Sequence, residues 1–186
     1  MHIAKTRVEA KADFVLLLDD LAMRRAQLTA FLSDWAELEQ VELNTAGMPE
    51  AEDALEIAPA CVMLILSIGS VEFDHSPAMG HVVATAERHA QLPSVILAEA
   101  GSGRDAAMAF RAGARGYIPA SMEPEVALRA LSFILHGGHF FPPSALRLPR
   151  SPAGGGPEDV TNLRGAVIAP IYPIRRDVDM RRVVEL

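Results

Sequence analysis

The fold is decided by residues 113–125, which read GARGYIPASMEPE. Gly113 stands where a preceding helical pattern stops, and glycine is the residue that helix C-caps prefer. Residues 116–118 form a short run typical of a buried strand. Pro124 then stands at an early position of a second helical pattern, which two glycines end. Helix, strand and helix in this order predict part of an alternating α/β fold.

The same alternation continues upstream. Short apolar runs without polar interruption are typical of parallel strands that are buried on both faces. Helical patterns lie between them, as the crossovers of a parallel sheet require. The sequence therefore predicts an α/β domain with a doubly wound, five-stranded parallel sheet. We expect strands at 14–18, 41–43, 61–66, 94–97 and 116–118, and helices at 21–38, 49–57, 78–91, 104–112 and 123–135.

Charge and composition divide the chain near residue 147. Residues 1–146 carry ten Lys or Arg and nineteen Asp or Glu, a net charge of −9, whereas residues 147–186 carry seven Arg and five acids, a net charge of +2. The second segment begins rich in Pro and Gly, which is typical of a linker. We therefore expect an N-terminal extension at 1–12, a domain at 13–146 and an irregular, Arg-rich tail at 147–186.

Composition also bounds the function. The whole chain has a net charge of −7, so wholesale nucleic-acid binding is not expected. Cys61 is the only cysteine, so no disulfide forms within the chain and a reducing compartment fits. No signal peptide or stretch long enough for a membrane span is recognised. These features predict a soluble cytoplasmic protein.

Four stretches carry a family resemblance. They are LLLDD at 16–20, LSIGS at 66–70, GARGYIPASM at 113–122 and GGHFFPP at 137–143. Their order and spacing resemble the receiver domains of bacterial two-component response regulators, in particular those of LuxR/NarL-type transcription regulators. The resemblance covers residues 13–146 and implies the flavodoxin-like receiver fold.

The family transfers a phosphoryl group to an aspartate at the end of its third strand. Compared position by position, this chain retains the acidic Mg²⁺-binding pair as Asp19 and Asp20, and the aromatic that turns inward on activation as Tyr117. It departs at three positions. Ser67 stands at the phosphorylated aspartate, Ala98 at the Ser/Thr that binds phosphoryl oxygens, and Ala120 at the lysine.

These departures predict a pseudo-receiver that is not phosphorylated. A serine hydroxyl is a weak nucleophile without a neighbouring base, and we expect none beside Ser67. Without a third carboxylate, Asp19 and Asp20 would hold Mg²⁺ weakly at best, so no cofactor is expected. Ala98 leaves room on its side of the sheet, and we therefore expect Tyr117 to be turned inward permanently.

Three functions compete. The first is a protein-interaction module that binds a protein partner and forms a homodimer through the fourth helix, fifth strand and fifth helix. Charges of both signs on that face would suit a symmetric contact, namely those of Arg104, Asp105, Arg111 and Arg115.

The second is a DNA-binding regulator of the LuxR type. Only about 30 residues follow Pro157, roughly half the length of the expected helix-turn-helix, so the output domain would be missing or shortened. DNA binding by this chain alone is therefore not expected. The third is an enzyme, for which neither a Gly-x-Ser-x-Gly elbow nor a convergent Ser/His/Asp set is found, so we expect no enzymatic activity.

Overall fold

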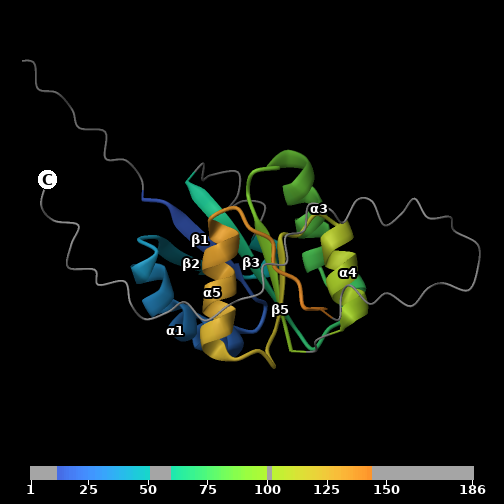
Figure 1. The fold of residues 1–186 in the computed structure, drawn as a ribbon, viewed down its shortest axis with the longest axis horizontal. Coiled ribbons are helices and arrows are strands. Elements are labelled where there is room, and N and C mark those ends of the chain that lie inside the picture. Colours follow the sequence, from blue (N-terminus) through green and yellow to red (C-terminus); the bar gives the residue numbers. More distant parts are fainter. Residues whose placement is uncertain (1–11, 51–59, 100–101, 144–186) are drawn as a thin grey trace, which may run out of the picture.

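The computed structural model describes residues 12–50, 60–99 and 102–143. Strands and helices alternate along these residues (Figure 1). The elements are β1 Phe14–Leu18, α1 Ala22–Leu38, β2 Glu42–Ala46, the short 3-10 helix η1 Met48–Glu50, β3 Cys61–Gly69, the 3-10 helix η2 Phe73–His75, α3 Ala78–Arg88, β4 Ser94–Ala98, α4 Gly103–Arg111, β5 Gly116–Pro119 and α5 Pro124–Leu135.

The five strands form one sheet in the order β2-β1-β3-β4-β5, and all neighbouring pairs are parallel. This confirms the predicted doubly wound α/β fold. The sheet is covered on both faces, as a parallel sheet must be. Helices α1 and α5 pack on one face, and α3 and α4 pack on the other (Figure 1).

Alternation along each strand divides the core into two layers. In β1, the side chains of Val15 and Leu17 join the α1–α5 layer, whereas Phe14, Leu16 and Leu18 join the α3–α4 layer. Every residue of β1 is buried, because successive side chains point to opposite faces and both faces are covered. This explains why the apolar runs in the sequence show no polar interruption.

Helix termini follow the predicted signals. Gly113 has a φ of +100° just after α4, and Gly137 has a φ of +93° just after α5. These values lie in the left-handed region, which costs glycine little. The Ser102 hydroxyl caps α4 by accepting a bond from the backbone N–H of Asp105 at 3.3 Å. Pro124 begins α5.

Four strands differ from their predicted bounds, and β4 and β5 do so by one residue each. β2 spans Glu42–Ala46 rather than 41–43. β3 continues to Gly69, so Ser67 lies inside the strand and not in the loop after it. The strand continues because Ile68 is buried in the α3–α4 layer and Gly69 still pairs with Ala98 after a register irregularity. The predicted helix at 49–57, the extension at 1–12 and the tail at 147–186 lie wholly or largely outside the described residues.

Candidate functional site at the carboxyl ends of the strands

The register of the sheet brings the predicted site residues to one edge. Leu18 pairs with Leu66, so the next residues, Asp19 and Ser67, are neighbours. Ala98 pairs with Gly69 on one side and with Pro119 on the other, which sets Ala120 just beyond. Asp19, Ser67 and Ala98 are buried, whereas Ala120 is exposed. The register therefore brings the residues that the resemblance names to one edge of the sheet.

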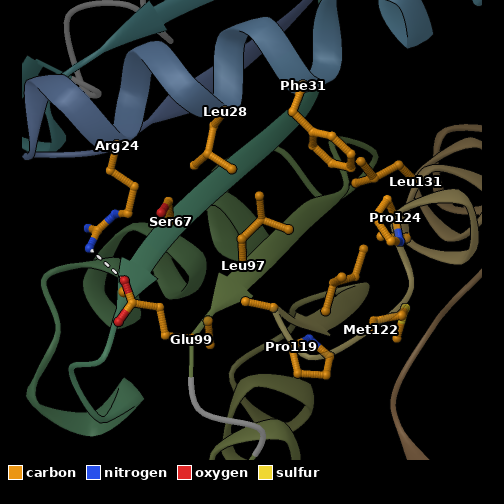
Figure 2. Close-up of a pocket in the computed structure, with 15 residues that line it drawn as sticks. Arg24, Leu28, Phe31, Ser67, Leu97, Glu99, Pro119, Met122, Pro124 and Leu131 are labelled. Atoms are coloured by element: carbon orange, nitrogen blue, oxygen red, sulfur yellow. Dashed lines mark ion pairs between the residues drawn. The ribbon is translucent and has the colours of Figure 1, made fainter.

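An arginine that the sequence analysis did not include dominates the site. Arg24, in the first turns of α1, donates from Nε to Asp19 Oδ2 at 2.6 Å and from Nη2 to Asp19 Oδ1 at 3.0 Å. Its Nη1 also lies 3.6 Å from Glu99 Oε1, as the dashed line in Figure 2 shows. A bidentate arginine–carboxylate contact is among the stronger charged pairs in proteins. Arg24 thus supplies a cation directly against the buried carboxylate.

Asp19 is held by further donors. The backbone N–H of Leu21 donates to Oδ1 at 2.7 Å, and the Ser67 hydroxyl also bonds the carboxylate. Burial raises the pKa of Asp19, but the bonds from Arg24, Ser67 and Leu21 more than offset it and leave the pKa below its ordinary value. We expected no base beside Ser67, but the carboxylate of Asp19 lies there. Its lowered pKa makes Asp19 a weak base.

Asp20 faces a different partner. Its side chain is exposed, and Oδ1 accepts a bond from the backbone N–H of Met48 at 2.8 Å. Mg²⁺ prefers several oxygen ligands in octahedral geometry. Here both oxygens of Asp19 are taken by Arg24, Asp20 bonds to another segment, and Ser67 offers only a neutral hydroxyl. These residues do not fit the Mg²⁺ site that the resemblance implies.

Gly69 allows Arg24 to reach this position. The guanidinium lies so close to the glycine backbone that an added Cβ would stand 2.0 Å from Nη1. Gly69 also has a φ of +59°, which side-chain-bearing residues rarely adopt. Both the space and the backbone conformation therefore require glycine at the end of β3.

A cavity of about 220 Å³ opens beside Arg24, between α1 and α5 and over the ends of β3, β4 and β5. Arg24, Leu28 and Phe31 come from one side of α1 and point toward the sheet in Figure 2. Ala120 contributes only a methyl group to the lining, at the position of the family lysine. The full lining is Arg24, Leu28, Phe31, Ser67, Gly69, Leu97, Ala98, Glu99, Ile118, Pro119, Ala120, Met122, Pro124, Ala127 and Leu131.

The opposite face of the sheet is filled. Tyr117 has no exposed surface and lies in the α3–α4 layer, which confirms the inward orientation that we predicted. Burial, followed by the negative charge of Asp105, raises the pKa of its hydroxyl to about 12. The hydroxyl also bonds the backbone of Ser102, ahead of α4. Tyr117 therefore links β5 to the start of α4.

The predicted dimer face needs one correction. Asp105 is only 5% exposed, and its carboxylate bonds the backbone of Phe73. It faces inward because it lies one helical turn before the buried Ala109. Burial raises the pKa of Asp105, and the charges of Glu72 and Asp74 raise it further. Asp105 therefore supplies no surface charge.

The three arginines of that face are at least partly accessible. Arg104 is exposed and pairs with Asp74 at 3.0 Å, while Arg111 is exposed with Nε 3.3 Å from the carbonyl of Ala107. Arg115 is half-buried, and its Nη2 donates to the carbonyl of Ala90 at 3.1 Å.

A second group of acidic and histidine side chains lies at η2. Glu72, Asp74 and His75 place oxygen and nitrogen atoms close together at η2, away from the predicted acidic pair, and Arg104 already neutralises Asp74. Within residues 12–50, 60–99 and 102–143, no helix is long and apolar enough to cross a membrane.

Comparisons of sequence find no relative. No protein-family model matches this chain, and no curated protein matches it. Comparison of structures, in contrast, finds many similar chains, and those described below are response regulators.

Three solved structures illustrate the likeness. A LuxR-family DNA-binding response regulator from Silicibacter pomeroyi shares 25% identity over 71% of this chain and 98% of its own, with a TM-score of 0.58. The isolated REC domain of RcsB from Salmonella enterica serovar Typhimurium, solved with phosphomimetic BeF3⁻, shares 15% identity over 74% and 98%, also at 0.58. An orphan response regulator of H. pylori shares 13% over 68% and 99%, at 0.54. The chain therefore has the fold of a response-regulator receiver domain.

Proposed function

We propose that this protein is a receiver-type signalling module of the cytoplasm that works without phosphorylation. One observation carries the proposal: the guanidinium of Arg24 lies 2.6 Å from Asp19, on the carboxylate that the family uses for Mg²⁺. A built-in cation makes a diffusible one unnecessary for the charge balance of the site. It also leaves no ligand pair through which Mg²⁺ could orient a phosphoryl donor.

The residues around Arg24 support the same conclusion. Ser67 offers a hydroxyl in place of the carboxylate that would form an acyl phosphate. Its neighbour Asp19 has a lowered pKa, which makes it a poor general base for activating that hydroxyl. Ala98 and Ala120 carry no donor for phosphoryl oxygens. Phosphoryl transfer depends almost entirely on positioning and electrostatic stabilisation, so the loss of these donors removes most of its catalysis.

The buried position of Tyr117 supports a fixed output state. In the family, phosphorylation biases two conformations that differ in the direction of this aromatic side chain. Here Tyr117 is already buried beside Ala98 and bonds the segment before α4. A ligand shifts a conformational equilibrium only if it binds one state more tightly than the other. A domain held in one state has no such equilibrium to shift, so the amount of complex depends on the concentration of its partner.

The surface of α4, β5 and α5 is the proposed contact for a protein partner, including a second copy of this chain. Arg104 and Arg111 supply exposed positive charge on α4. Because Asp105 is buried, the acidic counterpart would be Glu125 on α5, which is largely exposed and pairs with Arg129 at 3.3 Å. Exposed charges of both signs suit a symmetric contact.

Sedimentation velocity of the full chain tests this proposal. We expect a concentration-dependent dimer whose sedimentation is the same with and without Mg²⁺ and beryllofluoride, a phosphoryl mimic. Arg111→Glu should weaken the dimer, whereas Arg88→Glu, an exposed position on α3, serves as the matched control. A monomer at high micromolar concentration would contradict the dimer, and a shift caused by beryllofluoride would contradict phosphorylation independence.

The second candidate is the receiver part of a LuxR-type DNA-binding regulator. The observation in its favour is the likeness to the LuxR-family regulator from Silicibacter pomeroyi, which is described as DNA-binding. An electrophoretic mobility assay with this chain separates the candidates. Retarded DNA at physiological salt would favour the regulator, and free DNA at all concentrations would favour the interaction module.

A further inference from the structure

The cavity between α1 and α5 is apolar along most of its length. Leu28 and Phe31 of α1 form one wall, and Leu131 of α5 forms part of the opposite wall (Figure 2). The floor comes from the ends of the strands, where Leu97 and Ile118 contribute aliphatic side chains. A volume of about 220 Å³ exceeds the roughly 150 Å³ of an engineered protein cavity that binds benzene. One aromatic ring or a short alkyl chain would fit.

The end of the cavity at the loop after β4 is polar and carries a net negative charge. Arg24 and Glu99 line this end with one positive and one negative charge, and the buried carboxylate of Asp19, which lies outside the lining, adds a second negative charge against Arg24. Arg24 is committed to the buried Asp19 in a bidentate contact, whereas its distance to Glu99 is 3.6 Å. The Glu99 side chain is 54% exposed, so a carboxylate oxygen can accept a bond from a molecule that enters the cavity.

We propose that this cavity binds a small amphipathic cation: an aromatic or short aliphatic amine whose apolar part lies between Leu28 and Leu131 and whose ammonium pairs with Glu99. The net negative charge of the polar end favours a cation over an anion, since an anionic head group would have to compete with Asp19 for Arg24. Apolar pockets with a few polar groups at one end are the usual form of small-molecule sites.

The position of the cavity supports a binding role. Ligands of open α/β sheets bind beyond the carboxyl ends of the strands, and this cavity lies there. The small side chain of Ala120 leaves the space open. The proposal goes beyond the interaction module, because it adds a ligand and does not depend on the dimer face or on the absence of phosphorylation.

Calorimetry with three probes of one shape tests the proposal: 2-phenylethylamine, 2-phenylethanol and 3-phenylpropionate, each titrated into the full chain. We expect the amine to bind about fivefold tighter than the alcohol, because a partly exposed ion pair contributes about 1 kcal/mol. The carboxylate should bind weakest of the three probes. Glu99→Gln should remove the preference for the amine. Glu87→Gln, at an exposed position on α3, is the matched control and should leave it unchanged.

Two measurements locate the site independently. Ala127→Leu places extra methyl groups in the lining and should abolish binding of all three probes. Methyl chemical shifts of Leu28 and Leu131 should move on titration in the unmodified chain, which keeps the test valid if that variant fails to fold. Tightest binding by the carboxylate, shifts confined to other residues, or no binding at millimolar amine would each overturn the proposal.

Discussion

The two faces of the sheet differ at their carboxyl ends. On the α3–α4 face, Tyr117 is fully buried and its hydroxyl bonds the segment that begins α4. On the α1–α5 face, a cavity of about 220 Å³ is open, and Arg24 neutralises Asp19. One face is therefore closed and connected to the start of α4, whereas the other is open beside a paired carboxylate. The proposed receiver, which recognises a partner without being phosphorylated, predicts such a difference.

Truncating an aromatic side chain on each face should give the largest contrast. Tyr117→Ala removes a fully buried ring from a filled layer and should lower the free energy of unfolding by about 4 kcal/mol. Phe31→Ala removes a ring that is 37% exposed and already borders a cavity, so about 1 kcal/mol is expected. Urea unfolding of both variants measures the contrast. Equal losses would show that the two faces are equally well packed.

Removal of the built-in cation should give the next largest effect. Arg24→Met leaves the buried Asp19 without its main partner and should cost about 3 kcal/mol at neutral pH. Arg25→Met is the matched control, because Arg25 donates to the backbone carbonyl of Asp19 at 2.5 Å and not to the carboxylate. Its cost should be about 1 kcal/mol.

The pH dependence of that variant identifies the mechanism. In the unmodified chain the pKa of Asp19 is lowered on folding, so its contribution is present above the ordinary aspartate pKa of about 4 and is lost as pH falls through the folded value. Without Arg24, only the bonds from Ser67 and Leu21 oppose the effect of burial, so this pKa would rise and the variant would lose less stability as pH falls. The difference in free energy of unfolding should therefore shrink from pH 7 to pH 3. A difference independent of pH would assign Arg24 a packing role only.

The smallest expected effect concerns Gly69, whose lack of a side chain leaves space for the guanidinium of Arg24. Gly69→Ala should cost about 1–2 kcal/mol for a side chain at positive φ, with displacement of the guanidinium in addition. Gln40 has the same φ of 59° and already carries a side chain, so Gln40→Gly measures the backbone contribution by itself. In the Arg24→Met background the steric part of the cost should vanish. If Gly69→Ala costs as much stability in the Arg24→Met background, glycine is required only for the backbone conformation at position 69 and not for the space that Arg24 occupies.

The strands and the edge that holds the site could be predicted from the sequence. β1 has the predicted bounds because an uninterrupted apolar run between polar residues leaves little freedom in placing a buried strand. Asp19, Ser67, Ala98 and Ala120 meet because parallel strands end at the same edge of a sheet. The position of each residue along its strand is enough to place it at this edge, regardless of the chemistry of its side chain.

Side-chain reach and helix placement could not be predicted in the same way. Arg24 lies four residues before Leu28 and seven before Phe31, so helical spacing places it on the same face of α1 as the apolar stripe, but spacing alone does not show that its long side chain turns back along the helix to Asp19. Asp105 looked like a surface charge, although its spacing of four from Ala109 could have indicated a buried position. The cavity depends on how far apart α1 and α5 lie, and no single stretch of sequence determines that distance.

Phosphate independence is tested most directly by intact-mass spectrometry of the full chain after incubation with acetyl phosphate and Mg²⁺. Measurement at neutral pH preserves acyl phosphates, and Ser67→Ala serves as the reference for any modified species. We predict the mass of the unmodified chain, because Arg24 forms an ion pair with Asp19 and Ser67 replaces the carboxylate that accepts phosphate. One phosphate per chain, present in the unmodified sequence and absent from Ser67→Ala, would contradict a receiver that signals without phosphorylation.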